Sequence, residues 1–188
     1  MHIADTALPE VKRITLDIFR DHRGFFCERF HEDKFNAVGI HENFVQDNHS
    51  RSMPGVIRGL HFQFSPMQGK LVGVTHGRVL DVAVDIRPHS PFFGQHVSVE
   101  LSSENGELLW IPPGFAHGFC VLGDGVADVF YKCNALYSAQ GEAGIRFDDT
   151  QLGIEWPIAE KNRIISDRDR QLPTLAELKP QLAEWFPA

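Results

Sequence analysis

Short apolar segments alternate with glycine, proline, asparagine and aspartate along most of the chain. The clearest is RVLDVAVDI at 78–86, where the apolar residues Leu80, Val82, Val84 and Ile86 share one face and Asp81, Ala83 and Asp85 the other. This period of two is that of a β-strand. Further strands are predicted at 11–19, 24–30, 55–62, 71–75, 96–101, 108–112, 117–122 and 126–132. Many short strands at this spacing predict a sandwich or barrel.

Helical periodicity is confined to 31–40 and to 174–186, where the apolar residues that recur at helical spacing are Leu175, Leu178, Leu182 and Trp185. Pro180 is expected to bend or split the second helix, because it has no amide hydrogen and its ring clashes with the preceding turn. No repeat, low-complexity run or linker divides the chain. We therefore expect a single mostly-β domain over 1–188, with short peripheral helices and a C-terminal helical tail.

Charge and hydropathy disfavour two classes of partner. The 188 residues carry 25 acidic and 18 basic side chains, a formal charge of −7, so no dense basic face for nucleic acid or a membrane surface is expected. No stretch approaches the roughly 18 uninterrupted apolar residues of a membrane helix, and the N-terminus lacks the apolar core of a signal peptide. The three cysteines lie far apart without a CxxC pair, which favours reduced thiols and a cytoplasmic location.

Two of the ten histidines stand apart from the rest. His61 in RGLHFQ and His117 in IPPGFAHGF are flanked by glycine and apolar residues, so each is expected to be partly buried and hydrogen-bonded. A lone histidine of this kind is more often a satisfied core residue than a functional one. Arg58, Lys70 and Tyr131 also lie on apolar, strand-like segments, and charged residues are seldom buried without a partner. A pocket that binds an anion accounts for several basic groups in an acidic protein.

The two histidines could hold a metal or move protons. Zinc and iron take three or four ligands, and the nearest carboxylate downstream of His61 is Asp81, 20 residues on, so the pattern disfavours a metal. An acid–base site needs a base with a pKa near neutrality, a carboxylate to orient it, and a cation to stabilise negative charge. His61 fits the base. Its carboxylate is left open, because the acidic runs at 148–149 and 166–170 are equally well interpreted as solvated loops.

Nine ordered motifs point to one family. They are RGFF–E at 23–28, FVQDNHS at 44–50, V-I-RGLHFQ at 56–63, QGKLV at 68–72, DVAVDIR-x-x-SP-F-G at 81–94, LWIPPGFAHGF at 109–119, VFYK at 129–132, GIEWP at 153–157 and ISDRD at 165–169. In order and spacing they resemble the dTDP-4-dehydrorhamnose 3,5-epimerase family over nearly the whole chain. The resemblance implies a cupin-type jelly-roll β-barrel, usually a homodimer, that needs no metal and no redox cofactor.

The resemblance also implies a reaction and its residues. The substrate is dTDP-4-keto-6-deoxy-D-glucose, whose ketone acidifies the C–H bonds at carbons 3 and 5. Moving a proton from one face of each carbon to the other gives dTDP-4-keto-L-rhamnose. By motif, the general base is His61, its partner Asp169, the acid on the opposite face Tyr131, and the cation near the 4-keto oxygen Lys70. The implied nucleotide and sugar contacts are Arg23, Glu28, Gln46, Asn48, Arg58, His117, Glu142 and Arg168, of which the two arginines at 23 and 58 suit a diphosphate.

Three positions depart from the family's usual pattern. Gly73 stands where an arginine commonly follows QGKLV, Leu136 replaces the first of two adjacent tyrosines and leaves only Tyr137, and Arg168 replaces a lysine. With Gly73 at this position, a cationic contribution near the site is either lost or supplied from elsewhere. Together with Leu136, Gly73 puts the sugar pose in doubt, and with it the inversion of both carbons, since relatives invert carbon 3 or carbon 5 alone.

Arg58 and His61 pose a geometric problem, because on a straight strand they face opposite sides of the sheet. Gly59 permits a bulge that would turn both toward one cavity. Without a bulge, Arg58 would serve a neighbouring site or the dimer partner.

Three alternatives to the double epimerase stay open. A mono-epimerase of the same family would act on another dTDP-deoxysugar. A barrel that binds sugar nucleotides without catalysis is disfavoured by the joint presence of His61, Lys70, Tyr131 and Asp169. A metal-dependent cupin is the third. The physiological nucleotide is also open, because thymine and uracil differ by one methyl group.

Overall fold

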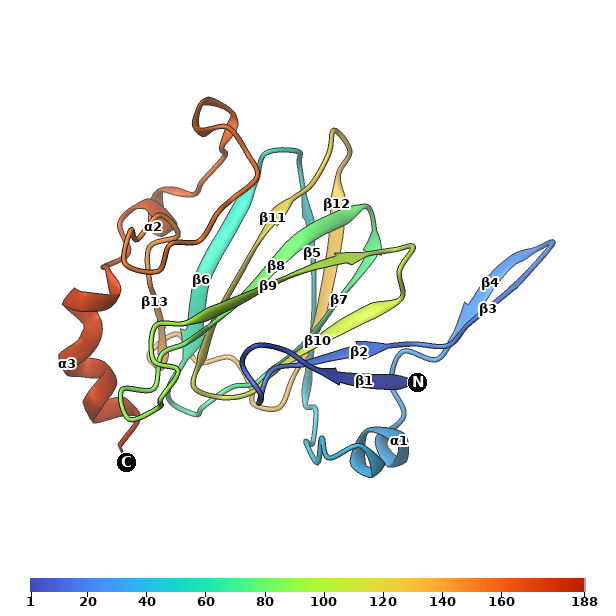
Figure 1. Cartoon of the computed structure of the whole chain (residues 1–188), viewed down its shortest axis with the longest axis horizontal. Helices are drawn as coiled ribbons and strands as arrows, with labels where there is room; N and C mark the ends of the chain where they lie inside the picture. Colours follow the sequence, from blue (N-terminus) through green and yellow to red (C-terminus); the bar gives the residue numbers. More distant parts are fainter. Residues whose placement is uncertain (188) are drawn as a thin grey trace.

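Two antiparallel sheets packed face to face form the body of the protein (Figure 1). This computed structural model describes residues 1–187. The six-stranded sheet has the order β1-β2-β10-β7-β12-β5 and the five-stranded sheet the order β13-β6-β11-β8-β9. Their bounds are β1 His2–Asp5, β2 Lys12–Thr15, β5 Gln46–Ser52, β6 Ile57–Gln63, β7 Lys70–His76, β8 Arg78–Asp85, β9 His96–Ser102, β10 Glu107–Ile111, β11 Phe115–Val121, β12 Ala127–Cys133 and β13 Glu142–Gly144. The predicted mostly-β fold is confirmed.

A third, two-stranded sheet is a hairpin that projects from the body (Figure 1). It consists of β3, Ile18–Asp21, and β4, Gly24–Cys27. The sequence predicts one strand over 11–19, but the structure divides this segment between β2 and β3, which belong to different sheets. The apolar run continues across the break because Leu16 is buried between the two strands, so periodicity alone does not show where the chain leaves the body.

Three apolar clusters hold the layers together. One fills the space between the sheets and includes Val72 on β7 and Phe119 on β11. A second covers the outer face of the five-stranded sheet, where the C-terminal segment adds Leu178 and Leu182. The third covers the outer face of the six-stranded sheet, where the segment after the hairpin adds Phe35. Each sheet is therefore buried on both faces over much of its area. Polar groups on the inner faces are accommodated where a cavity takes the place of the apolar core.

Strand β8 shows how this layering changes the meaning of an alternating pattern. The face that carries Val82 and Val84 packs under the C-terminal helix, as expected of apolar residues. The face that carries Asp81 and Asp85 is not solvated either, since both side chains are fully buried. Buried carboxylates need partners, and here Asp81 binds His117 and Asp85 binds Arg87.

The helices lie outside the sheets, as predicted. They are α1 Glu32–Ala37, η1 Glu160–Asn162, α2 Asp167–Arg170 and α3 Leu175–Trp185. A capping box of Thr174 and Glu177 starts α3. Pro180 does not split α3, contrary to expectation: it lies on the exposed face, where the carbonyl that loses its donor can bind water. Within residues 1–187 no helix is long and apolar enough to cross a membrane.

Candidate active site

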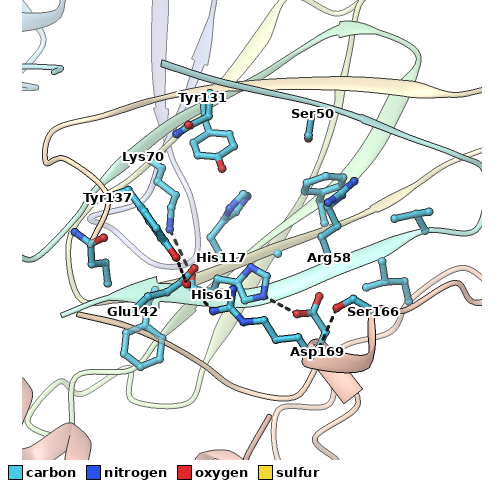
Figure 2. Close-up of a pocket in the computed structure, with 18 of the residues that line it drawn as sticks. Ser50, Arg58, His61, Lys70, His117, Tyr131, Tyr137, Glu142, Ser166 and Asp169 are labelled. Atoms are coloured by element: carbon cyan, nitrogen blue, oxygen red, sulfur yellow. Dashed lines mark hydrogen bonds and ion pairs between the residues drawn. The ribbon is translucent and has the colours of Figure 1, made fainter. Parts of the chain in front are cut away.

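A cavity of about 690 Å³ lies between the two sheets, bordered by α2 at one edge (Figure 2). Its walls come from β5, β7 and β12 of the six-stranded sheet and from β6 and β11 of the five-stranded sheet. Ten of the twelve site residues predicted from the sequence line it: His61, Asp169, Tyr131, Lys70, Gln46, Asn48, Arg58, His117, Glu142 and Arg168. The structure thus gathers side chains that span more than 120 positions of sequence, 46 to 169, into one space.

A bulge in β6 turns two of these side chains to the same side. His61 lies opposite His117 of β11, whereas Arg58 lies opposite Phe119. Between these two pairs the chain advances three residues along β6 but only two along β11, which is a β-bulge in β6. Gly59 has a φ of +110°, and a Cβ there would come within 2.6 Å of the Cα of Gly118. Only glycine fits both demands. The predicted bulge is confirmed, and Arg58 lines the cavity of its own chain.

His61 is held by a buried carboxylate. Its Nε2 is 2.7 Å from Oδ1 of Asp169, and the other oxygen of Asp169 accepts a hydrogen bond from the amide of Gly59 at 3.1 Å. The Asp169 amide in turn donates to Ser166 Oγ, which caps α2. Of the two acidic runs that the sequence left open, 166–170 therefore supplies the partner. Its carboxylate is buried, not solvated.

The environment of Asp169 keeps it ionised. Burial alone would raise the pKa of this carboxyl, but the hydrogen bond and charge of His61 and the amide of Gly59 outweigh burial, so that its pKa lies below the usual value. An ionised carboxylate accepts the Nε2 hydrogen of the adjoining imidazole, which fixes its tautomer and orientation and leaves the Nδ1 lone pair free. The pair is thus arranged to accept a proton at His61.

Lys70 is a buried cation beside this pair. Its side chain is nearly inaccessible, and Nζ is 3.5 Å from the carbonyl oxygen of His61. Burial lowers the pKa of the Lys70 ammonium, and the nearby Cys133, Glu142 and Asp81 oppose this only in part. Within residues 1–187 it forms no ion pair, so its charge is available to a group in the cavity. Such a charge acts strongly in a site that excludes water.

Tyr131 projects from the opposite wall. It lies on β12 of the six-stranded sheet, while His61 lies on β6 of the five-stranded sheet (Figure 2). Burial is the main cause of a raised pKa of the Tyr131 phenol, which therefore keeps its proton at neutral pH. A proton acceptor and a proton donor face one cavity from two sides.

A second histidine–carboxylate pair forms the inner wall. His117 Nε2 is 2.9 Å from Oδ2 of Asp81, and both side chains are buried. Burial raises the pKa of Asp81, although the charge and hydrogen bond of His117 act in the other direction. Sequence reasoning noted Asp81 only as a distant carboxylate. The pattern of β8 could have identified Asp81, because the positions next to it on the same face of the strand, Val79 and Ala83, carry apolar residues that are buried.

A polar cluster lines one edge of the cavity. Oε2 of Glu142 accepts hydrogen bonds from the Tyr137 hydroxyl at 3.0 Å and from the Arg168 guanidinium at 2.5 Å. The cluster connects β13 to α2, which carries Asp169. The charge of Arg168 is consequently neutralised within the protein.

The two substitutions suspected of disturbing the cavity lie outside its lining. A Cβ at Gly73 would meet Leu108 and Phe130 at 2.5 and 2.6 Å, on the outer side of the sheet, where Arg29 stacks on Phe130. The expectation that position 73 contributes a cation near the site is therefore wrong. Leu136 is 64% exposed and likewise does not line the cavity, whereas Tyr137 does.

Arg23 and Glu28, the other two predicted substrate contacts, lie apart from the ten residues that line the cavity. Neither lines the cavity of its own chain. Arg23 is at the turn of the β3–β4 hairpin, paired with Asp21, and Glu28 follows the hairpin and pairs with Lys34. Sequence motifs identify residue types in order, but they do not show which segment leaves the body of the chain.

No group of three or more histidine, cysteine or carboxylate side chains among residues 1–187 is arranged to hold a metal ion. The two histidines of the cavity each bind one carboxylate, 2.7 and 2.9 Å away. One ring nitrogen of each, Nε2, is thereby engaged in a hydrogen bond of the kind that an acid–base site needs.

Comparison with known proteins identifies the family. The family model for dTDP-4-dehydrorhamnose 3,5-epimerase matches residues 5–177. The chain belongs to the dTDP-4-dehydrorhamnose 3,5-epimerase family. A family member from Shigella flexneri named dTDP-4-dehydrorhamnose 3,5-epimerase is 52% identical over 171 residues, which cover 90% of this chain and 93% of that protein.

Solved structures of this epimerase family have the same fold. A dTDP-6-deoxy-D-glucose-3,5-epimerase from Legionella pneumophila, in complex with dTDP-4-keto-L-rhamnose, is 47% identical and superimposes with a TM-score of 0.92 over 96% of both chains. A 3′-monoepimerase from Streptomyces bikiniensis, in complex with dTDP-quinovose, is 31% identical, with a TM-score of 0.87 over 96% of this chain and 90% of that one. The predicted jelly-roll class is confirmed by this likeness.

Proposed function

We propose that the chain converts dTDP-4-keto-6-deoxy-D-glucose to dTDP-4-keto-L-rhamnose by inverting carbons 3 and 5. The observation that carries this proposal is the His61–Asp169 pair facing Tyr131 across one cavity, with Lys70 between the walls. A base and an acid on opposite sides are what inversion at carbon requires, and a cation between them suits the negative charge that develops in the reaction.

The first step removes a proton next to the ketone. His61 Nδ1, the ring nitrogen that Asp169 does not bind, takes the proton, and the electron pair of the C–H bond moves into the ring to form an enolate whose charge lies on the 4-keto oxygen. Lys70 stabilises that oxygen, and Asp169 stabilises the imidazolium. No electrons leave the substrate, because the ketone itself accepts the electron pair, and so the step needs no redox cofactor.

The second step returns a proton from the other wall. The Tyr131 hydroxyl protonates the same carbon on its opposite face, the enolate collapses to the ketone, and the configuration is inverted. Its raised pKa keeps the phenol protonated until the enolate forms. Exchange with water resets both groups, and the same sequence at the second carbon completes the double epimerisation.

The substrate's diphosphate is held by Arg58, which forms a forked contact with phosphate oxygens. Gln46, Asn48 and His117 line the same cavity and supply hydrogen bonds to the sugar and the nucleotide.

The whole chain, 1–188, acts as a single epimerase domain. The three cysteines are all free thiols, which supports a reducing, cytoplasmic compartment.

The active form is a homodimer in which the hairpin of one protomer completes the cavity of the other. Three large apolar side chains on the hairpin, Phe19, Phe25 and Phe26, are 64%, 51% and 67% exposed, and such a patch is typical of an interface. Arg23 and Glu28, which match the family's substrate contacts, lie on or next to this hairpin and outside their own cavity. A partner's cavity gives them a place to act.

Two variants test the assignment of base and acid. His61→Ala is expected to lower kcat by at least about a hundredfold, the lower end of general acid–base effects, with an unchanged melting temperature. Tyr131→Phe is expected to keep proton abstraction, seen as loss of hydrogen to solvent, while it blocks inversion. The control is His41→Ala, an exposed histidine. Full turnover in His61→Ala would refute the base.

Mono-epimerisation is the second candidate, favoured by the structural likeness to a 3′-monoepimerase. The two functions differ in which carbons are inverted. Identification of the product by proton coupling constants separates them, because each inversion changes a ring hydrogen between axial and equatorial.

A further inference from the structure

Arg58 is a cation of the cavity that has no ion-pair partner among the described residues and lies apart from Lys70. Arg168 is neutralised by Glu142 at 2.5 Å, and Lys70 is buried beside His61. Arg58 has no carboxylate within 4.0 Å among residues 1–187. A diphosphate that enters the cavity therefore has Arg58 as its strongest partner.

Ser52 on the neighbouring strand β5 fixes the direction of this guanidinium. The buried Ser52 Oγ accepts a hydrogen bond from Nε of Arg58 at 3.0 Å, and the Arg51 carbonyl accepts one from Nη2 at 3.4 Å. Both contacts use the side of the fork that faces β5. Nη1 is left without a protein partner in the described part of the chain, so Nη1 and the second hydrogen of Nη2 can meet a ligand.

Ser50 lies two residues earlier on the same strand. The alternation of β5 puts Gln46, Asn48, Ser50 and Ser52 on the inward face. Ser50 Oγ is buried and has no hydrogen-bond partner within residues 1–187, although the residue lines the cavity. A buried hydroxyl without a partner is unfavourable, and such groups are rare in folded proteins unless a ligand or water satisfies them.

The close-up view brings these observations together. Figure 2 shows Ser50 and Arg58 on one side of the cavity, with Tyr131 and Lys70 on the other. The reacting carbons belong near His61, Lys70 and Tyr131. The hydroxyl of Ser50 therefore lies away from the chemistry and toward the anion that Arg58 attracts.

We propose that Ser50 is a substrate-binding residue that donates a hydrogen bond to the phosphate group held by Arg58, and that Ser52 is the positioning residue for Arg58. The inference rests on the proposed function, which supplies the diphosphate. It explains why the inward face of β5 carries amides and hydroxyls in place of the apolar side chains of a core strand.

Titrations followed by proton NMR test the Ser50 contact without relying on turnover. The two ligands are dTDP and thymidine, which differ only in the diphosphate. Ser50→Ala is expected to weaken dTDP binding about tenfold, the effect of one hydrogen bond to a charged group, and to leave thymidine binding within about twofold. The control is Ser98→Ala, on the exposed face of β9, with both affinities unchanged.

Two results would overturn the contact. Either dTDP binds Ser50→Ala as tightly as it binds wild type, or thymidine is weakened by the same factor as dTDP. Failure of the wild type to bind dTDP at all would instead refute the proposed function. A matched melting temperature for Ser50→Ala, Ser98→Ala and wild type shows that the comparison is made on folded protein.

A double-mutant cycle tests Ser52. If Ser52 acts only by orienting Arg58, then Ser52→Ala weakens dTDP binding in the wild-type background and has no further effect in Arg58→Ala. Equal effects of Ser52→Ala in both backgrounds would contradict the positioning role. Because Ser52 is buried, Ser52→Thr, which keeps the hydroxyl, serves as the second variant and should restore most of the affinity.

Discussion

The side chains of the cavity have their protonation states set by burial and by a few close partners. Asp169 stays ionised because His61 and the Gly59 amide bind its two oxygens. Tyr131 stays protonated because it is desolvated. At this scale the resemblance to the family predicted which residues lie together in the cavity. Residue types and local patterns alone did not predict it. The carboxylate partner of His61 is 108 positions away, and no local pattern indicates such a contact.

The pH dependence of catalysis should report Lys70. Burial lowers its pKa from the usual 10.5, and the ammonium form stabilises the enolate, so activity falls as rising pH removes this proton, below the pKa of an ordinary lysine. Burial shifts the Tyr131 phenol in the opposite direction, because it raises the pKa of that group. We expect an alkaline limb in kcat/KM that is absent from the residual activity of Lys70→Arg, because an arginine side chain keeps its charge up to about pH 12.

Lys132→Arg is the control for this profile. Lys132 is adjacent to Tyr131 in sequence, but it pairs with Asp47 on the outer side of the sheet. Its alkaline limb should match that of wild type. A limb that persists unchanged in Lys70→Arg would assign the titration to another group.

Strands β5 and β13 show why part of the architecture escapes sequence reasoning. Both form walls of the cavity, and their inward positions carry polar groups such as Asn48 and Glu142. A search for alternating apolar residues finds strands that face a core and misses strands that face a ligand. The bulge in β6 was predictable, because Gly59 and the need to turn both Arg58 and His61 inward point to the same position.

Gly59→Ala tests the bulge. An alanine at this position would have to adopt an unfavourable φ of +110°, and its methyl group would approach Gly118 Cα to 2.6 Å. We expect a loss of about 2–5 kcal/mol in the free energy of unfolding, which corresponds to a fall of roughly 5–15 °C in melting temperature. Calorimetry measures it. Gly125→Ala, with open space and no positive φ, should change the melting temperature little, and equal melting of both variants would contradict the account.

The whole molecule combines a rigid double sheet with one projecting element. Most of the strands and the helices near 31–40 and 174–186 were predicted from periodicity, and the jelly-roll class from the family resemblance. The position of Arg23 and Glu28 was not predicted, because the sequence does not reveal that 18–27 leaves the body as a hairpin. Their place is a property of the assembly that we propose, not of the single chain.

Light scattering tests that assembly. A chain of 21.2 kDa is expected to elute with twice this mass. The double variant Phe19→Ser/Phe26→Ser changes two residues that face each other across the hairpin, and it should shift the mass toward the monomer and lower activity together. The control is Met53→Ser, 59% exposed and away from the hairpin. A variant that becomes monomeric and keeps full activity would show that the partner's hairpin adds nothing to the cavity.

The central claim is that one base and one acid exchange protons at two carbons of a single substrate. A proton NMR time course of dTDP-4-keto-6-deoxy-D-glucose with the protein in deuterated water tests it most directly. We predict that deuterium enters at carbons 3 and 5, that the product has the L-rhamno configuration, and that His61→Ala incorporates none. Entry at one carbon alone would contradict the double epimerase, and no entry with wild-type protein would contradict the substrate.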